Sequence, residues 1–445
     1  MAILLQVIIG LVILGILVVI HELGHFLMAK ACHIRVLAFS VGFGRPLFKK
    51  TIGETEYRIS AIPFGGYVHM AGEQPEEGAK IGPGDFNAKP TWQRALVAAS
   101  GPFANFFFAM VFLMAAFLIG IDSPIYLKRP VIGAVTPGSA SDRAGLRAGD
   151  SIVAINAAPV KSWEDVQSAL SSQAPGYSVA FVRGQREEST ALSMPKISGG
   201  GLPKEPAGGL LPAYPPIVGS VGEGSPAQKA GLLAGDTIVS INGRSIYSWP
   251  QLSEMVLRYD SLSRGLTVVL KRSGSLVSEK IVPEYKSDAK RYLIGIAPKT
   301  PPSVRISYGL PAAMAKTFRK TADYTTMIFD VVAKLVSKQV PVQQLAGPVG
   351  IVQMSGIVAM GGISAILDFM ALIGINLAVL NVFPLVITDG GLLLFLLIET
   401  IRRKPLPVKT QMLINRIAIS FFITLFLFVT YNDIMRIPAL LKLVK

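Results

Sequence analysis

Residues 2–25 read AILLQVIIGLVILGILVVIHELGH, and no other stretch of the chain constrains the architecture as strongly. The part from residue 2 to residue 20 contains no charged side chain. An α-helix needs roughly 20 apolar residues to cross a hydrocarbon core about 30 Å thick. The stretch therefore predicts a membrane-spanning helix that ends in the ionisable residues His21, Glu22 and His25, directly behind its apolar part.

A secretory signal peptide is the alternative interpretation of this stretch. No Lys or Arg precedes it, because the first basic residue is Lys30, and no small-residue cleavage site follows it. We therefore expect a retained membrane helix.

Three further apolar segments follow. Residues 95–121 and 369–388 carry no charge, and residues 417–432 form a shorter run. The last run reaches spanning length only if residues 412–415 are included and Arg416 extends its charged end to the interface. With 51% hydrophobic and 16% charged residues overall, the chain is predicted to be a multi-pass membrane protein with four transmembrane helices.

The net charge of +15 could suggest a nucleic-acid partner, but the basic residues cluster beside membrane segments. They are Lys30, Arg35, Arg45, Lys49, Lys50 and Arg58 after the first helix, and Arg402, Arg403, Lys404 and Lys409 before the last. The positive-inside rule assigns such loops to the cytoplasm. It places both termini and the stretch from about 122 to 360 on the far side, and we expect lipid rather than nucleic acid as the partner. The single cysteine, Cys32, excludes an internal disulfide.

An internal repeat occupies the region between the second and third apolar segments. AGLRAGDSIVAIN at 144–156 returns as AGLLAGDTIVSIN at 230–242. Each copy has short Val- and Ile-rich runs bounded by turn residues, which indicates a small β-rich domain. Each copy also has a short helix-like segment, at 163–170 and at 249–257. The Gly- and Pro-rich residues 195–216 form the junction between the copies.

After Pro301 and Pro302, apolar residues recur at helical spacing with charged residues between them. The apolar positions are Met314, Phe318, Met327, Ile328, Val331 and Leu335. An amphipathic helix that packs on the membrane face or on the protein is one interpretation, and a solvated helix facing a core is the other.

His21-Glu22-Leu23-Gly24-His25 is a pattern typical of zinc sites. Two histidines four residues apart lie on one helix face, so both imidazoles can reach one metal ion. Glu22 is in position to take a proton from a metal-bound water. Ionisable residues at membrane depth are costly and usually functional. The alternative is that His21 and Glu22 only cap the helix at the interface.

A catalytic zinc needs a third protein ligand and an open position for water. Residues 381–391, NVFPLVITDGG, supply the best candidate in Asp389. Asn381 and Pro384 interrupt the apolar segment, and Pro384 breaks or kinks a helix. Broken helices are tolerated at membrane depth where they line a protein cavity. The alternative is that Asp389 caps a helix before two glycines.

Together these residues resemble the site-2 proteases, a family of intramembrane zinc metalloproteases. The resemblance runs along the whole chain: HELGH at 21–25, GFG at 42–44, PFGGYV at 63–68, GPFANF at 101–106, AGPVG at 346–350 and the segment from Asn381 to Asp389. The two repeats resemble PDZ domains of the circularly permuted bacterial kind. One departure is that Val386 and Thr388 stand where the family often has Pro and Leu, which puts the local backbone shape and the substrate fit in doubt.

The resemblance implies four transmembrane helices, a membrane-re-entrant β hairpin and two inserted PDZ-like domains. The expected parts are a first membrane part at 1–126, PDZ-like domains at 127–213 and 214–300, an amphipathic helical segment at 301–360 and a second membrane part at 361–445.

The family's residue roles carry over by position. His21, His25 and Asp389 would bind Zn²⁺, and Glu22 would be the general base. Asn381 would steady the substrate or the oxyanion, an amide's natural role. Further substrate contacts would come from Pro384 and, in the hairpin, from Gly65, Gly66 and Tyr67. Peptide-binding loops would include Gly209 and Leu210 in the first repeat and Ile294, Gly295 and Ile296 in the second.

The family's activity implies hydrolysis of a peptide bond in or beside the membrane segment of a single-span protein. The substrates would be proteins already cut by another protease, such as an anti-sigma factor in envelope stress signalling, or leftover signal peptides. The PDZ-like pair would exclude uncut ectodomains, or would act only as a spacer. The expected location is a bacterial inner membrane, with the termini and PDZ-like domains outside and the zinc site toward the cytoplasm.

Two other classes of function are weighed against this one. A membrane scaffold would use the PDZ-like pair to bind partner C-termini and would keep at most a structural metal. A transporter with a metal at a broken helix is disfavoured, because the apolar segments show no inverted repeat. The intact HELGH and Asp389 favour the enzyme.

Overall fold

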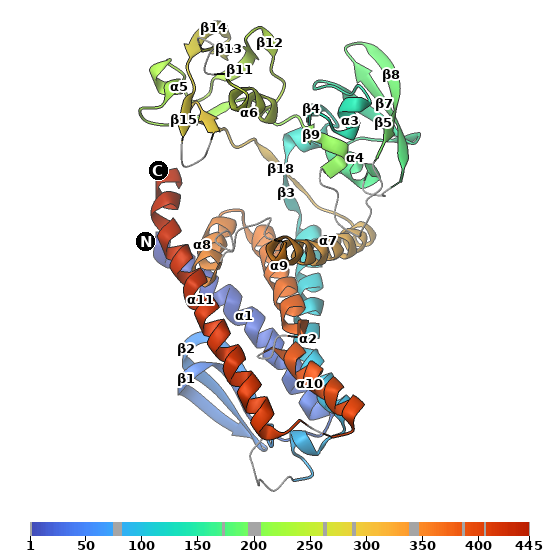
Figure 1. Ribbon diagram of the computed structural model, residues 1–445, viewed down its shortest axis with the longest axis vertical. Coiled ribbons are helices and arrows are strands. Elements are labelled where there is room, and N and C mark those ends of the chain that lie inside the picture. The colour runs from blue at the N-terminus through green and yellow to red at the C-terminus, as the bar shows by residue number, and fades with distance from the viewer. Residues whose placement is uncertain are drawn as a thin grey trace. The chain divides into compact units, whose positions relative to one another are not determined.

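We describe the protein from a computed structural model, which places residues 2–73, 82–170, 174–194, 206–260, 265–286, 291–337, 347–384, 388–404 and 406–444. The chain divides into two compact units (Figure 1). The first unit combines Met1–Ile121 with Ile306–Lys445, and the second is Asp122–Arg305. The finer domain boundaries expected from the sequence stay predictions.

Four described helices of the first unit are long and apolar enough to cross a membrane. They are α1 (Ala2–Ala31), α2 (Thr91–Ile119), α9 (Ile363–Val382) and α11 (Val408–Val444). The prediction of four spans is confirmed at this level. The fourth span is longer than the sequence indicated. Its apolar stretch is Lys409–Met435, which contains the expected run at 417–432 and extends beyond it at both ends.

The end of the first helix was predicted wrongly. We expected the HELGH motif at the helix terminus, but α1 continues to Ala31. Nothing in residues 26–31 disfavours a helix, and the turn that ends it comes at His33, which has φ +55°. The backbone N–H of Ile34 then donates to the carbonyl of Ala29 at 2.8 Å, a common way to close a helix C-terminus. The motif therefore lies inside a regular helix, which fixes the relative positions of its side chains.

The third span is also shifted relative to the apolar segment at 369–388. Helix α9 begins after Gly362, which has φ +81°, and it ends at Val382. The next residue, Phe383, is extended, as expected for a residue that precedes a proline. Asp389 is therefore not at the end of the third span but is the first residue of a separate helix, α10 (Asp389–Arg402).

Helix α7 (Leu310–Val336) contains every apolar position on which the expectation of an amphipathic helix rested, within the expected segment 301–360. Its buried side includes Ala313 and Ile328, which pack with Leu113 and Phe117 of α2 and with α9. Other apolar side chains of α7, such as Phe318, remain exposed. Helix α8 (Pro348–Ala359) follows, and the Asp433 carboxylate of α11 accepts the backbone N–H groups at its start.

Small residues let the spanning helices approach closely. A Cβ atom on Gly24 of α1 would lie 2.8 Å from the Cβ of Ala104 in α2, and closer still to the carbonyl oxygen of Ser100. A Cβ on Gly374 of α9 would lie 3.3 Å from the Cβ of Ala109 in α2. Small residues at helix interfaces are the usual means of tight packing in membranes. They bring the three helices that carry or border the metal motif together.

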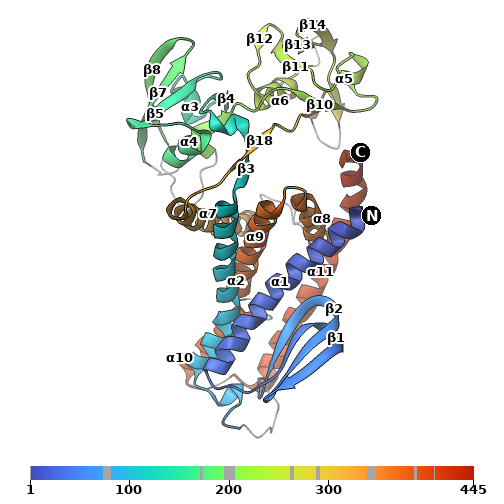
Figure 2. The ribbon, with the colours of Figure 1, turned by 180° about the vertical axis from the view of Figure 1, so that it is seen from behind.

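A long hairpin follows α1 and lies beside it in both views (Figures 1 and 2). Its strands are β1 (Val36–Ile52) and β2 (Thr55–Met70). Each strand is long enough to bend and pair more than once. Residues 38–41 pair with 66–69 on one side and with 56–59 on the other, and 48–52 pair with 55–59. The segment 66–69 thus forms one edge of the sheet described here.

The second unit contains the two repeats. The elements of the first are β4 (Ile132–Val135), α3 (Ala140–Arg143), β5 (Ser151–Ile155), β6 (Ala158–Pro159), α4 (Trp163–Leu170), β7 (Gly176–Arg183), β8 (Arg186–Ser193) and β9 (Leu210–Pro212). Those of the second are β10 (Val218–Val221), α5 (Pro226–Lys229), β11 (Thr237–Ile241), β12 (Arg244–Ser245), α6 (Trp249–Leu257), β13 (Leu266–Arg272), β14 (Ser275–Ile281), β15 (Glu284–Lys286), β16 (Arg291–Leu293) and β17 (Ile296–Pro298). The helical segments expected at 163–170 and 249–257 are confirmed.

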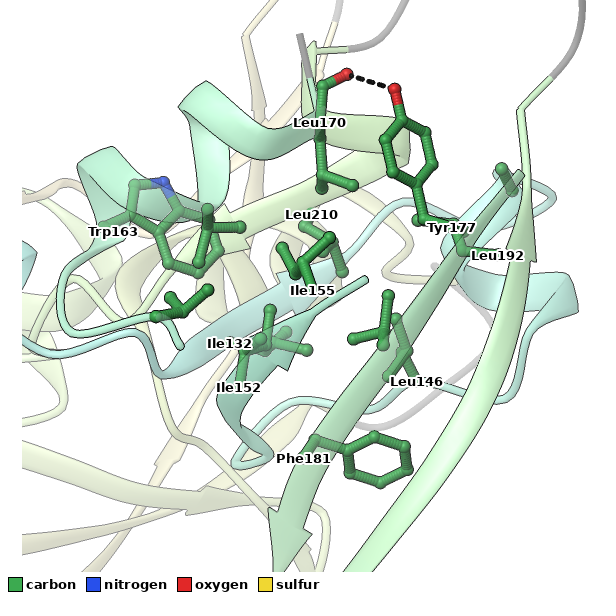
Figure 3. Packing of buried hydrophobic residues seen from close by; sticks show 14 residues of the cluster. Ile132, Leu146, Ile152, Ile155, Trp163, Leu170, Tyr177, Phe181, Leu192 and Leu210 are labelled. Carbon is green, nitrogen blue, oxygen red and sulfur yellow. Dashed lines mark hydrogen bonds between the residues drawn. The ribbon is translucent and has the colours of Figure 1, made fainter. Parts of the chain in front are cut away.

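The two repeats have the same topology and the same internal ion pair. Their four-stranded sheets have the orders β6-β5-β7-β8 and β12-β11-β13-β14. Arg183 pairs with the buried Asp150 at 2.7 Å, and Arg272 pairs with the buried Asp236 at the same distance. Figure 3 shows the apolar core of the first repeat, in which Trp163 lies to one side of the packed Ile and Leu side chains.

Candidate metal centre

Three side chains from two helices converge on one point. His21 and His25 lie one turn apart on α1, and their Nε2 atoms are 3.2 Å apart. The Oδ2 atom of Asp389 is 3.2 Å from the His21 Nε2, and its Oδ1 atom is 3.3 Å from the His25 Nε2. One donor atom from each residue can be chosen so that all lie within 4.8 Å of one another.

This arrangement fits a zinc ion by its chemistry and by the space around it. Two imidazole nitrogens and a carboxylate oxygen are a donor set of catalytic zinc sites. The facing residue of α2 is Gly101, where a Cβ would lie 2.7 Å from the Cε1 of His25 and 2.8 Å from the Cε1 of His21. Only a residue without a side chain leaves both rings in place.

The ring of His25 is held from behind by α2. Its Nδ1 donates to the backbone carbonyl of Val97 at 2.7 Å. A carbonyl can only accept, so the proton is on Nδ1 and the lone pair on Nε2 faces His21 and Asp389. Such a bond on the far nitrogen is the usual support of a metal-binding histidine.

Asp389 depends on the break between α9 and α10. A Cβ on Gly390 would lie 2.5 Å from the carbonyl carbon of Val382, so the chain can turn this tightly only with glycine there. The Thr388 hydroxyl donates to the carbonyl of Phe383 at 2.9 Å across the break.

The far end of α10 is tied to α2. Arg94 donates to both carboxylate oxygens of Glu399, at 3.1 and 2.5 Å. The side chains are only 11% and 18% exposed. A two-pronged guanidinium–carboxylate pair fixes orientation as well as distance. The helix that carries Asp389 is therefore anchored to the helix that supports His25.

Glu22 faces the edge of the hairpin. Its carboxylate accepts a hydrogen bond from the backbone of Val68. A Cβ on Gly66 would lie 3.5 Å from the Glu22 Cγ and 2.7 Å from the carbonyl oxygen of Ser40. The glycine at 66 thus lets this strand lie close to Ser40 of the neighbouring strand, while the distance to Glu22 is an ordinary contact.

A polar cavity of about 300 Å³ joins these groups. It is lined by His21, Glu22, His25, Tyr67, Val68, Met70, Glu73, Phe86, Val97, Ala98, Asn381, Thr388, Asp389 and Leu392. Glu73 is a second acid on its wall, and burial raises the pKa of its carboxyl above the ordinary value. The cavity brings together an acid, the candidate metal-binding triad and an amide.

The structure places most of the expected site residues in or beside this cavity. His21, Glu22, His25, Tyr67, Asn381 and Asp389 line it. Gly66 is adjacent, and Gly65 lies against the ring of Phe43. Pro384 lines a separate apolar cavity. Of the two departures from the family pattern, Thr388 lines the polar cavity and Val386 lies outside the described residues.

The expected peptide loops lie elsewhere, in the second unit. The side chains of Leu210 and Ile294 are 2% and 4% exposed and belong to the two cores, so they do not line an open groove. Gly209 and Gly295 have positive φ and directly precede strands β9 and β17. Ile296 is the first residue of β17. Peptide binding there stays a prediction.

Sequence reasoning missed three residues of α2 that contact the two histidines: Val97, Gly101 and Asn105, whose side-chain amide lies 3.3 Å from the Nδ1 of His21. They recur every four residues on α2 and so share one helix face. A signal was available for two of them, because Asn105 is a polar residue in an uncharged apolar run and Gly101 is a small residue beside a proline. Their partners on α1 depend on tertiary packing.

The chain matches Peptidase family M50 over residues 9–425, and it therefore belongs to that family. It is a zinc metalloprotease of the site-2 type, with Zn²⁺ as its cofactor.

Individual relatives cover nearly the whole chain. A "Regulator of sigma-E protease RseP" of Salmonella typhimurium is 34% identical over 96% of this chain and 98% of its own. The protein of the same name from Escherichia coli is 32% identical over the same shares. Among solved structures, a PDZ domain of HtrA3 bound to a phage-derived ligand is 31% identical over 16% of this chain and 64% of its own, with a TM-score of 0.15.

Proposed function

We propose that the protein hydrolyses peptide bonds in or next to the transmembrane segment of single-span membrane proteins. The observation that carries the proposal is the convergence of His21, His25 and Asp389 beside Glu22, at a break between two apolar helices. The same residues are proposed as the zinc ligands. Zinc, when bound, supplies Lewis-acid chemistry: it polarises a carbonyl and makes water nucleophilic near neutral pH.

Glu22 is proposed as the proton carrier of the reaction. It takes the proton of the attacking water and later gives it to the leaving amine, as general base and then acid. Its place beside the triad and at the wall of the cavity supports this role. Asn381 reaches the same cavity, and its amide N–H is suited to an oxyanion.

An apolar substrate segment has a suitable place next to the polar cavity. A second cavity of about 570 Å³ lies between α2, α7 and α9. Pro102, which lines it, follows Gly101 in sequence, and Val382–Pro384 follow Asn381. Its wall is lined mainly by apolar residues. We infer that it accepts apolar side chains that flank the bond to be cut.

The hairpin edge is proposed to hold the substrate in an extended form. A helical substrate must lose its internal hydrogen bonds before its carbonyls can be attacked, and strand addition replaces those bonds. Residues 66–69 form a sheet edge close to Glu22. Gly66 and Tyr67 would then contact the substrate, with Gly65 shaping the strand beside them.

We propose that the hairpin re-enters the membrane. It exposes large apolar side chains, which soluble surfaces rarely gather. They are Phe43, Leu47, Phe48, Ile59 and Ile62, each at least 46% exposed. With the positive-inside rule, this favours a zinc site toward the cytoplasm, termini and repeats on the other side, and a bacterial inner membrane.

The named relatives are regulators of sigma-E, and we propose an equivalent place in envelope stress signalling. The substrates would be anti-sigma factor-like proteins already shortened by another protease, or leftover signal peptides. The repeats would act as PDZ-like domains that exclude uncut ectodomains. Each repeat has its own apolar core, so each can act as a folded obstacle.

Purified protein and a synthetic single-span peptide test the activity. Wild type with zinc should cut the peptide within or beside its apolar segment, as read by mass spectrometry, and a chelator should stop it. Glu22→Gln should retain zinc and lose activity by about 100- to 10,000-fold. Cleavage by Glu22→Gln at the wild-type rate would refute the role assigned to Glu22. Cleavage by zinc-free protein would refute the requirement for the metal.

A further inference from the structure

His21 and His25 sit in matching positions, but their supports differ. The His25 ring is fixed by the Val97 carbonyl, whereas the Nδ1 of His21 faces the side-chain amide of Asn105 at 3.3 Å. Val97, Gly101 and Asn105 are four residues apart on one face of α2. That face therefore contacts the two histidines at three positions. Val97 and Asn105 each place a polar group behind one ring, and Gly101, without a side chain, leaves room for both rings between them.

The orientation of the Asn105 amide decides which nitrogen of His21 carries the proton. With Nδ2 toward His21, the amide would donate, the Nδ1 would accept, and the proton would sit on Nε2. A neutral imidazole in that form cannot bind a metal through Nε2. With the amide turned over, its oxygen accepts from the Nδ1–H, and the Nε2 lone pair is free.

Nothing described around the amide opposes the second orientation. Asn105 is 1% exposed, and its Oδ1 has no hydrogen-bond partner among the described residues. Turning the amide over therefore breaks no bond to that oxygen. Nitrogen and oxygen of a side-chain amide have nearly the same shape, so the hydrogen-bond network decides between them.

We propose that Asn105 is a positioning residue for zinc, whose side-chain oxygen accepts the Nδ1–H of His21 and fixes the ring and its tautomer. This inference rests on the zinc site of the proposed function. It makes α2 the support of both histidines, through a backbone carbonyl for one and a side chain for the other. Outer partners of this kind typically change metal affinity by about 10- to 100-fold when removed.

Zinc affinity, measured on the full-length protein by competition with a chelator of known affinity, tests the proposal. Asn105→Leu keeps the size but not the acceptor, and it should bind zinc about 10- to 100-fold more weakly. Asn105→Asp keeps an acceptor and should bind at least as tightly as wild type. The thermal midpoint of the zinc-free protein should change little in either variant, which separates positioning from folding.

Ser364→Ala is the matched control, because Ser364 is also buried on a spanning helix and its hydroxyl has no partner among the described residues. It should leave zinc affinity unchanged. Wild-type affinity in Asn105→Leu would overturn the proposal. An equal loss in Asn105→Asp would also overturn it, because Asp keeps an oxygen that can accept the Nδ1–H of His21, and this comparison decides even if Asn105→Leu does not fold. His21→Ala separates the two claims: if it keeps wild-type affinity, the metal site itself is wrong.

Discussion

Gly101→Ala should remove the metal function while leaving the fold in place. The new Cβ would lie 2.7 and 2.8 Å from ring carbons of His25 and His21, whereas ordinary contact between carbons begins at about 3.5 Å. A ring must therefore move by close to 1 Å. The His25 ring cannot do so without losing its bond to Val97, which is only 2.7 Å long.

The expected size of the effect follows from that displacement. A 1 Å misplacement of reacting groups can cost about 100-fold in rate, and metal ligands tolerate about 0.5 Å. We expect kcat/KM to fall at least about 100-fold, together with a large loss of zinc affinity. The free energy of unfolding should change by less than about 1 kcal/mol. The higher helix propensity of alanine stabilises α2 by about 1 kcal/mol, which offsets the loss of one hydrogen bond of about the same size.

The assay combines zinc content, chelator competition and cleavage of a single-span peptide. Gly374→Ala is the matched control, because its Cβ would lie 3.3 Å from Ala109, where a shift of a few tenths of an ångström suffices. That variant should bind zinc like wild type. If Gly101→Ala also bound zinc and cut peptide like wild type, the geometry assigned to the site would be refuted.

Two further perturbations address the supports of the fold. Arg94→Met leaves the Glu399 carboxylate without its partner, so we expect the free energy of unfolding to fall by about 3 kcal/mol. Because Glu399 and Asp389 both lie on α10, we also expect about tenfold weaker zinc binding in chelator competition. Unchanged zinc affinity would contradict this coupling. The hydrogen bond from Arg272 holds the pKa of Asp236 below its ordinary value, so this pair stabilises the second unit above about pH 4, and the stabilisation is lost as the pH falls through the folded-state pKa. The urea midpoint of Arg272→Met should thus lie well below that of wild type at pH 7 and approach it in acid; a gap that widens in acid would be inconsistent with the pair.

Local patterns were enough for much of the fold. The uncharged runs indicated all four spans, and the repeated AGL…GD…IN stretches indicated two equal β-rich parts, which share an ion pair that the pattern does not display. Helix ends were harder to predict. Apolar composition alone does not show where a helix begins or ends, so the start of α9 at Ile363 and the extension of α1 to Ala31 were missed.

The site was predictable as far as chemistry marks it. His21, Glu22, His25 and Asp389 are ionisable residues in apolar surroundings, and such residues are conspicuous. The supporting residues are not. A helix that is apolar on every side has no periodicity that shows which face points inward, so the sequence could not predict that Gly101 faces the two imidazoles. Pro384 marked the break before Asp389, but the sequence left open whether Asp389 begins a new helix.

The most direct test of the central claim is zinc-edge X-ray absorption of the purified full-length protein, alongside its zinc content. The account predicts one zinc per chain, two imidazole nitrogens at about 2.0 Å, and oxygen ligands at about 2.0–2.2 Å, without sulfur. Asp389→Ala should lower the zinc content and alter the oxygen shell. A sulfur ligand at about 2.3 Å, or the same spectrum and zinc content in His21→Ala, would contradict it.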